Sequence, residues 1–186
     1  MKQKILAIKK MIKDECSDSA VGSWFYDTHL IAVENFAKKL LKRLPKANKE
    51  IVMLSIWLHD LQRIRGIKGD HSKVGAHEAE KMMKKFNYDN NIIRQVKEAI
   101  LTHQCKGKIR PKSLEGKILS SADAMSHYAN DFYLRILLSG SRSLEEAKKW
   151  ALEKLDRDYN SKIQFDFARD MIKKQHNALK IIFTMK

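Results

Sequence analysis

The sequence predicts an all-α fold, and two observations support this prediction. The 186 residues include only 7 Gly and 2 Pro, which are too few for the many turns of a β-sandwich or β-barrel. Apolar residues also recur at helical spacing almost from end to end, without an internal repeat. The length suits one globular domain over residues 1–186, with a core at about residues 20–130 and a C-terminal helical cover at about residues 131–186.

Three helices are expected in the first third of the chain. The segment Met1–Ile12 sets lysines between apolar residues at helical spacing, and it lacks the unbroken apolar region of a secretory signal. Residues Thr28–Leu44 carry one apolar stripe, which extends back to His29, and Pro45 closes the segment. Residues Ile51–Leu61 are apolar on nearly every side, which is typical of a helix surrounded by other helices.

Three further helices are expected before residue 130, separated by breaks that contain glycine or proline. A loop at Arg65–Asp70 leads into a helix at Ser72–Phe86, and Gly107–Pro111 interrupts the chain between Ile92–His103 and Leu114–Tyr128. In the first two helices the apolar residues share one stripe. In the third, the central residues are apolar or small apart from a single aspartate.

The C-terminal third is expected to be helical and to hold no candidate for chemistry. A short apolar run at Leu134–Leu138 precedes a helix whose Ser143 and Glu146 fit a capping box, and a long amphipathic helix follows at Phe165–Phe183. The larger apolar residues of this third are expected to lie in the core: Trp150, Leu155, Met171, Leu179 and Ile182.

The charge of the chain favours anionic partners. With 37 Lys+Arg against 22 Asp+Glu, the formal net charge is +15. The lysines are scattered along helices without interleaved aromatic residues, so a phosphorylated small molecule is expected rather than a nucleic acid. The longest apolar stretch falls far short of the roughly 20 residues of a membrane span, and Cys16 and Cys105 fit no disulfide framework. We therefore expect a cytoplasmic protein without a membrane partner, and the oligomeric state stays open.

Four polar residues lie on predicted inward faces: His29, His59, Asp60 and Asp123. Burying so many titratable groups is costly unless they are hydrogen-bonded, paired or bound to a metal ion. Adjacent residues point about 100° apart on a straight helix, but at a helix end His59 and Asp60 can both reach one ion. Two imidazoles and two carboxylates without a thiolate suit Mn²⁺, Mg²⁺, Fe²⁺, Ni²⁺ or Co²⁺ better than a closed thiolate zinc site.

These residues and their surroundings resemble the HD superfamily of metal-dependent phosphohydrolases, which is defined by a histidine, a His-Asp doublet and a distal aspartate on an all-α fold. The order here is His29, His59-Asp60 and Asp123. The segments HLIAVENFA at 29–37 and WLHDLQR at 57–63 look like the first-ligand and doublet helices, and Gly75-Ala76 with Ala79, ILTH at 100–103 and KILSSADA at 117–124 look like later landmarks. The resemblance covers about residues 20–130 and implies an HD-domain-like bundle with additional C-terminal helices.

The resemblance implies a role for each of the four residues. His29, His59, Asp60 and Asp123 would coordinate a divalent ion, and the water bound to that ion would attack phosphorus. Asp60 and Asp123 would also be catalytic, because either can accept a hydrogen bond from that water, and the choice of base stays open. The implied substrate is a phosphate ester or phosphoanhydride of a nucleotide-like molecule. Pyrophosphohydrolase, nucleotidase and phosphodiesterase activities all stay open.

Further candidate residues accompany this set. His71 and His103 are candidates for binding a second metal ion, as in two-metal members of the superfamily, or for contacting substrate phosphate. Arg63 and Lys117 are candidates for phosphate binding. Arg63 stands where some nucleotide monophosphatases of the family have a glutamate, which weakens a nucleotidase assignment. His127 fits either the surroundings of the site or the core.

Two other function classes stay open. One is a non-catalytic module that binds a nucleotide or nucleic acid through the basic face of an HD-like scaffold, and steeply salt-dependent binding would identify it. The other is a two-iron oxygenase on the same scaffold. That oxygenase would require His71 and His103 as ligands of redox-active iron.

Overall fold

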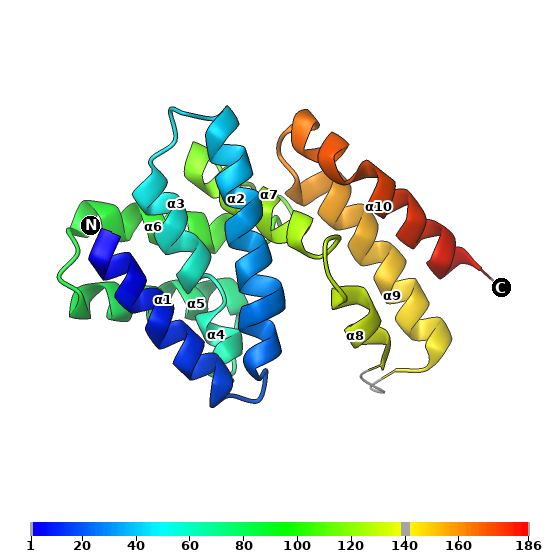
Figure 1. Ribbon diagram of the computed structural model, residues 1–186, viewed down its shortest axis with the longest axis horizontal. Helices are drawn as coiled ribbons and strands as arrows, with labels where there is room; N and C mark the ends of the chain where they lie inside the picture. Colours follow the sequence, from blue (N-terminus) through cyan, green and yellow to red (C-terminus); the bar gives the residue numbers. More distant parts are fainter. Residues whose placement is uncertain (1, 139–141, 186) are drawn as a thin grey trace.

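The computed structural model describes residues 2–138 and 142–185, and every regular element in these ranges is helical (Figure 1). The all-α class predicted from the sequence is therefore confirmed. Met1 of the predicted first helix, and residues 139–141 and 186 of the predicted domain, lie outside the described ranges. None of the described helices combines the length and the hydropathy that a membrane crossing requires.

Seven α-helices and one π-helical turn make up the N-terminal part of the described chain. In chain order they are α1 (Lys2–Ser17), the π-helical turn η1 (Phe25–Leu30), α2 (Ile31–Arg43), α3 (Lys49–Leu58), α4 (Leu61–Ile64), α5 (His71–Lys85), α6 (Asn90–Thr102) and α7 (Leu114–Ser126). Side chains fix four of the helix starts, because Asn48, Asp70, Asp89 and Ser113 each accept a hydrogen bond from a backbone N–H of the following helix.

Two helix boundaries differ from the prediction. The stripe predicted as one helix from Thr28 starts within the π-helical turn η1 and continues as α2. The helix predicted to reach Leu61 ends at Leu58, because His59 and Asp60 form a turn before the short helix α4. At Asp60 the backbone has φ −104° and ψ 14°, outside the usual α region. This break directs the two side chains of the doublet toward the same space.

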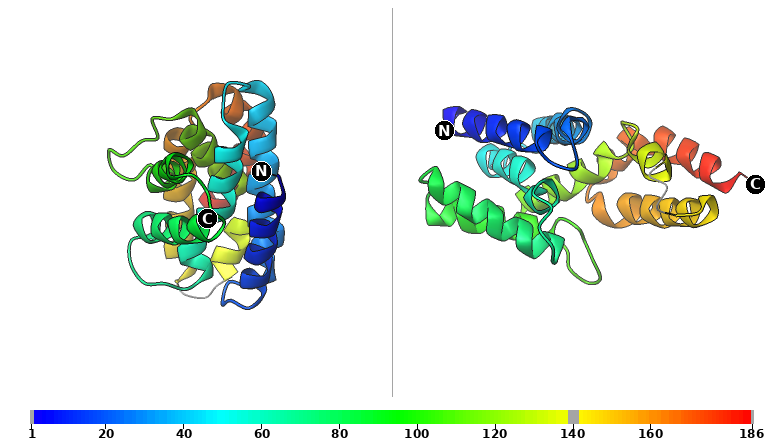
Figure 2. Two further views of the ribbon diagram at one scale, coloured as in Figure 1. Left: turned by 90° about the vertical axis from the view of Figure 1, so that its left-hand side faces the viewer. Right: turned by 90° about the horizontal axis from the view of Figure 1, so that it is seen from below.

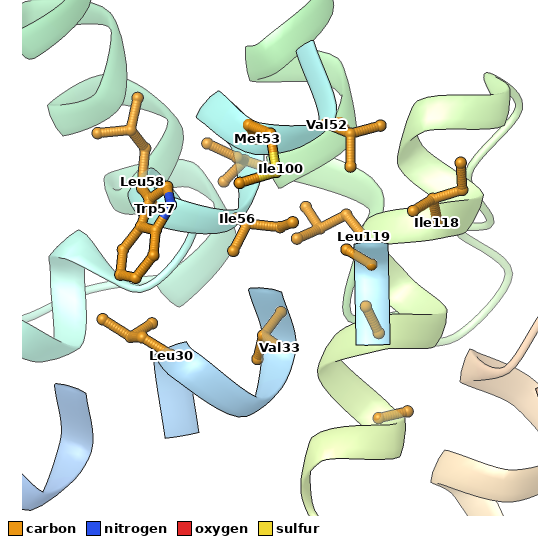
Figure 3. Packing of buried hydrophobic residues seen from close by; sticks show 14 of the residues in the cluster. Leu30, Val33, Val52, Met53, Ile56, Trp57, Leu58, Ile100, Ile118 and Leu119 are labelled. Carbon is orange, nitrogen blue, oxygen red and sulfur yellow. The ribbon is translucent and has the colours of Figure 1, made fainter. Parts of the chain in front are cut away.

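The core of the N-terminal part surrounds α3. Every residue from Ile51 to Leu58 is buried, and Trp57 is completely covered. Figure 3 shows the side chains of α3 among those of Val33, Ile100 and Leu119, which come from α2, α6 and α7. Each large side chain that is fully buried stabilises the fold by roughly 1.5–3 kcal/mol. The prediction that other helices surround this segment is confirmed, and the packed core therefore fixes the helix end that carries the doublet.

The C-terminal part contains α8 (Phe132–Leu138), α9 (Leu144–Arg157), the π-helical turn η2 (Asp158–Lys162) and α10 (Asp166–Thr184). These helices lie at the opposite end of the molecule from the N-terminus, as Figures 1 and 2 show. They contact the N-terminal part through η2 and α10, which both pack against α7. The predicted capping box of Ser143 and Glu146 is present at the start of α9.

The apolar residues expected in the C-terminal core divide into two groups. Leu155 is buried, and Trp150 and Leu179 pack against the core while remaining partly exposed. Met171 and Ile182 are 38% and 49% exposed, so the prediction that they lie in the core is wrong. Both lie on α10, which packs on one side only.

Candidate metal centre

His29 lies in the π-helical turn η1, and only 2% of the residue is exposed. Its Nδ1 atom is 3.1 Å from Ser126 Oγ, and the Ser126 hydroxyl donates to the Asp123 carbonyl at 2.7 Å. Because a hydroxyl has one proton, Ser126 Oγ accepts the Nδ1–H of His29. The lone pair of His29 is therefore on Nε2, which faces carboxylate oxygens of Asp60 and Asp123 at 3.1 and 3.6 Å.

His59 follows α3 directly and is completely buried. Its Nδ1–H donates to the Ile56 carbonyl at 2.8 Å. Its Nε2 atom faces Asp60 Oδ2 at 3.3 Å and Asp123 Oδ1 at 3.8 Å, and neither contact has the geometry of a good hydrogen bond. A buried ring nitrogen without a partner, facing oxygens that only accept, is costly unless a cation lies between them.

The electrostatics of this cluster favour a cation. Burial alone would lower the pKa of His59, but the charges and hydrogen bonds of Asp60 and Asp123 outweigh burial and raise that pKa to about 10. Burial would raise the pKa values of the two carboxyl groups, yet chiefly His59 beside Asp60 and Lys162 beside Asp123 hold them well below their usual range. His29, His59 and Asp123 each offer one ligand atom, and these atoms lie within 4.8 Å of one another. The residues therefore fit a bound metal ion.

His71 and His103 lie beside this cluster. His71 Nε2 is 2.9 Å from Asp60 Oδ1, and its Nδ1 atom is 3.0 Å from the amide oxygen of Gln62. His103 donates its Nδ1–H to the Ile100 carbonyl at 2.6 Å, and its ring centroid lies 5.5 Å from that of His71. Burial lowers the pKa of His103 to about 3, which keeps its Nε2 atom unprotonated and available as a ligand.

The two oxygens of Asp60 face different histidines. Its Oδ2 atom faces His29 and His59 at 3.1 and 3.3 Å, whereas its Oδ1 atom faces His71 at 2.9 Å. The structure thus brings together His29, His59, Asp60, Asp123, His71 and His103, all of which the sequence singled out.

The cluster opens into a cavity of about 520 Å³. Arg63 lines this cavity, and its Nε atom is 3.8 Å from Asp60 Oδ1. Lys106 also lines it, whereas Lys117 is absent from its walls, so the structure does not bring Lys117 to the site. The apolar part of the wall is aromatic and consists of Phe25, Phe132 and Trp150.

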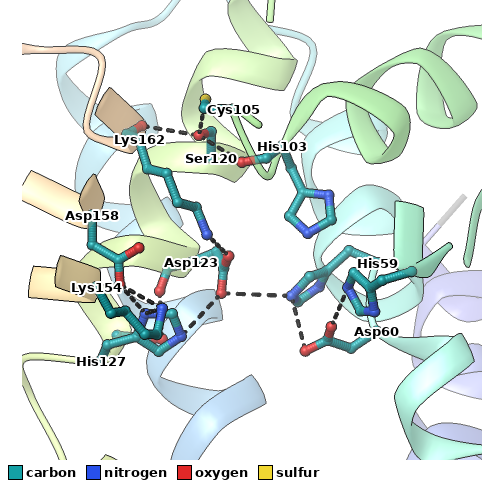
Figure 4. A network of polar contacts seen from close by, with 12 residues as sticks. His59, Asp60, His103, Cys105, Ser120, Asp123, His127, Lys154, Asp158 and Lys162 are labelled. Carbon is teal, nitrogen blue, oxygen red and sulfur yellow. Dashed lines mark hydrogen bonds and ion pairs between the residues drawn. The ribbon is translucent and has the colours of Figure 1, made fainter. Parts of the chain in front are cut away.

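The C-terminal part, in which the sequence showed no candidate for chemistry, contributes directly to the site (Figure 4). Lys162, the last residue of η2, donates to Asp123 Oδ2 at 2.5 Å. Asp158, the first residue of η2, accepts hydrogen bonds from His127 Nδ1 at 2.8 Å and from Lys154 Nζ at 2.7 Å. Lys162 and Lys154 are only 5% and 8% exposed. In a chain with so many lysines, residue type alone could not distinguish these two from solvated ones.

His127 belongs to the surroundings of the site. Its Nε2 atom faces Asp123 Oδ1 at 3.6 Å, and its ring stacks on Phe132 with the centroids 4.1 Å apart. Burial and the neighbouring charge of Lys154 lower the pKa of His127 to about 3. His176 of α10 stacks on Tyr159 of η2.

Comparisons with known proteins agree with this geometry. The family model of the HD domain matches residues 26–127, a segment that contains all four of the first candidate ligands. The crystal structure of a predicted HD superfamily hydrolase from an uncultured Thermotogales bacterium has a similar fold, with a TM-score of 0.59 and 21% sequence identity over 95% of this chain and 87% of that chain. No curated protein matches the chain. Because the HD domain model spans more than half of its residues, the chain belongs to the HD domain family.

Proposed function

We propose that this protein is a metal-dependent phosphohydrolase whose metal centre is held by His29, His59, Asp60 and Asp123. The observation that carries the proposal is the set of imidazole Nε2 atoms that face carboxylate oxygens in one buried cluster. Membership of the HD domain family supports it, and so does the likeness to a predicted HD superfamily hydrolase.

The donor set suits a divalent ion such as Mn²⁺, Mg²⁺, Ni²⁺, Co²⁺ or Fe²⁺. When bound, such an ion polarises a phosphoryl oxygen and lowers the pKa of a water molecule. We propose that His71 and His103, together with Asp60 Oδ1, hold a second ion. The distance of 2.9 Å between His71 Nε2 and Asp60 Oδ1 supports this second position.

The side chains of the cluster have separate proposed tasks. Asp60 and Asp123 are the catalytic carboxylates, because their oxygens are the proton acceptors at the centre of the cluster. Hydrogen bonds from Nδ1 to Ser126 and Ile56 hold His29 and His59 with their Nε2 atoms facing the carboxylates, and a hydrogen bond from Nδ1 to Ile100 fixes the ring of His103. Such outer hydrogen bonds orient metal ligands and raise their basicity.

The proposed substrate is a phosphate ester or phosphoanhydride of a nucleotide-like molecule. A cavity of about 520 Å³ has the size of a small-molecule site. Aromatic side chains in its wall suit a flat organic group, and cations suit the phosphate oxygens. The cations that line it and reach solvent are Arg63, Lys106 and Arg157.

A cytoplasmic location is part of the proposal. Cys16 and Cys105 are both free and buried, so the described chain carries no disulfide. Free thiols are usual in a reducing compartment, where a disulfide would not be maintained.

The proposal is tested by comparing His59→Gln with His77→Gln. His77 is an exposed histidine of α5, so its replacement controls for the loss of an imidazole outside the cluster. Each protein is incubated with one divalent ion, freed of unbound ions, and examined by elemental analysis and by phosphate release from a panel of nucleotides. The unchanged protein and His77→Gln should retain metal and activity, and His59→Gln should lose both. Full metal content in His59→Gln would contradict the proposal.

The position of His71 and His103 also favours a second candidate, a two-iron oxygenase. Such an enzyme would require His71 and His103 as ligands of redox-active iron, and the centroids of these two rings lie 5.5 Å apart. Oxygen uptake by the iron-loaded protein, without phosphate release from any substrate, would replace the phosphohydrolase with this candidate.

A further inference from the structure

The two central carboxylates present their oxygens in different ways. Both oxygens of Asp60 face histidine Nε2 atoms. Asp123 directs only Oδ1 toward imidazoles, because its Oδ2 atom is engaged by Lys162 Nζ at 2.5 Å. The imidazoles that face Asp123 Oδ1 are those of His29, His59 and His127, at 3.6, 3.8 and 3.6 Å.

Lys162 is fixed in place at both ends. Its carbonyl accepts hydrogen bonds from Ser120 Oγ at 2.9 Å and from Gln164 Nε2 at 3.2 Å. Ser120 lies one turn before Asp123 in α7, so the same helix holds the backbone and the ammonium group of Lys162. Burial would lower the pKa of Lys162, but the negative charge of Asp123 outweighs it and raises the pKa, so the amine stays charged.

We infer that Lys162 is a positioning residue that leaves Asp123 only one oxygen for a metal ion and thereby selects against large ions. The inference rests on the proposed metal centre. Ca²⁺ takes six to eight oxygen ligands and accepts both oxygens of a carboxylate, whereas smaller divalent ions need fewer. A carboxylate held on one side therefore disfavours Ca²⁺ relative to Mn²⁺.

The charge of Lys162 must be separated from this effect. An ammonium group beside the centre repels every divalent ion to a similar extent, and its removal changes the affinity for all of them together. The ratio of the Ca²⁺ and Mn²⁺ affinities cancels that common contribution. This ratio therefore reports how many oxygens Asp123 can offer.

The test uses Lys162→Met with Lys154→Met as a matched control. Lys154 is equally well buried, but its ammonium group pairs with Asp158, which is not a proposed ligand. Dissociation constants for Ca²⁺ and for Mn²⁺ are measured by titration of the metal-free proteins. Lys162→Met should raise the affinity for Ca²⁺ relative to Mn²⁺ by about tenfold, the usual size of effects from groups behind a metal ligand. Lys154→Met should leave the ratio unchanged.

An unchanged ratio in Lys162→Met, or an equal rise in Lys154→Met, would overturn the inference while leaving the metal centre intact. If the wild-type protein binds neither of these ions nor Mg²⁺, Ni²⁺, Co²⁺ or Fe²⁺, the proposed centre is wrong and the inference is wrong with it. Circular dichroism shows whether each variant folds. If Lys162→Met does not fold, Lys162→Gln gives the same test, because its side chain stays polar and is too short to reach Asp123 in the same way.

Discussion

His29 and Lys162 both lie in π-helical turns, and both face the carboxylate of Asp123. His29 Nε2 is 3.6 Å from Oδ1, and Lys162 Nζ is 2.5 Å from Oδ2. A π-helical turn widens the helix and moves side chains off the stripe that an α-helix would give them. The two π-helical turns found in the described ranges thus both contribute to the candidate metal centre, in keeping with the frequent occurrence of such turns at functional sites.

The contacts of Asp60 with three histidines lead to a prediction about metal content. Asp60→Asn should lose all tightly held metal, because the two oxygens of Asp60 face His29, His59 and His71. His103→Ala should lose only the second ion, because His103 is a proposed ligand of that ion alone, although its ring lies 5.3 Å from that of His59 and 5.5 Å from that of His71. Elemental analysis of both variants counts the ions per chain. If Asp60→Asn and His103→Ala lose the same number of metal ions per chain, Asp60 does not take part in two metal positions.

Gly75 explains a close contact behind the doublet. A Cβ atom at Gly75 would lie 3.0 Å from the carbonyl oxygen of His59. Helix α5 would therefore have to move away from the His59-Asp60 doublet. Gly75→Ala should destabilise the fold by about 1–3 kcal/mol, as overpacking generally does, and it should weaken metal binding by moving His59. Thermal unfolding and metal titration measure the two effects.

Gly66→Ala is the control for this substitution. Gly66 has φ +61° and nothing within 4 Å of an added Cβ, so its replacement strains the backbone without pushing His59. Stability should fall in Gly66→Ala while metal affinity stays unchanged. Equal metal affinities in both alanine variants would show that the contact behind His59 is unimportant for the centre.

Metal removal should lower the thermal stability of the protein. A ligand that binds only the folded state at 100 times its Kd stabilises that state by about 2.7 kcal/mol. We therefore expect the Tm to fall by several degrees when the metal-loaded protein is stripped with a chelator. Asp123→Asn should lose this difference, whereas Asp166→Asn, which alters a carboxylate that is 94% exposed, should keep it. A chelator effect of equal size in Asp123→Asn would argue for binding elsewhere.

Glu80 leads to a prediction about acid stability. Hydrogen bonds from Lys84 and then Lys97 lower the pKa of Glu80 from 4.5 to about 2. A carboxyl group whose pKa is lower in the folded state contributes stability above pH 4.5, and this contribution is lost as the pH falls toward 2. Glu80→Gln should therefore lose less stability than the unchanged protein between pH 4.5 and 2. Urea unfolding across this range measures the slope.

Glu153 provides the control for the acid experiment. It is an exposed residue of α9 that makes no ion pair with any described residue. Glu153→Gln should leave the slope of stability against pH unchanged. A flatter slope in both variants would mean that net charge, rather than the pairs of Glu80, governs unfolding in acid.

The candidate ligands could be predicted because each polar residue interrupts an apolar pattern. His29 extends the stripe of α2, and Asp123 stands among apolar and small neighbours in α7, so both had to face inward. Because the buried helix ends at His59, the adjacent side chains of His59 and Asp60 can point toward the same cluster, as the sequence predicted. Periodicity reports burial well when an element is regular and closely packed.

The contributions of the C-terminal part could not be predicted in the same way. Lys154, Asp158 and Lys162 are spaced four residues apart, a pattern that charged residues on exposed helices also show. Their burial depends on η2 packing against α7, a contact between elements that are distant in sequence. The π-helical turns were missed for a related reason, because an apolar stripe does not reveal one extra residue in a turn.

The stretch that defines family membership ends at His127, whereas the cation that holds Asp123 comes from beyond that stretch. A chain shortened to residues 26–127 would keep every histidine and both carboxylates of the candidate centre. Without Lys162, however, Asp123 Oδ2 would be hydrogen-bonded only by water. The candidate ligands and the lysine that orients one of them therefore come from different parts of this chain. If Lys162 selects the ion as proposed, the C-terminal helices could change while every candidate ligand stays the same, and the preferred ion would change with them.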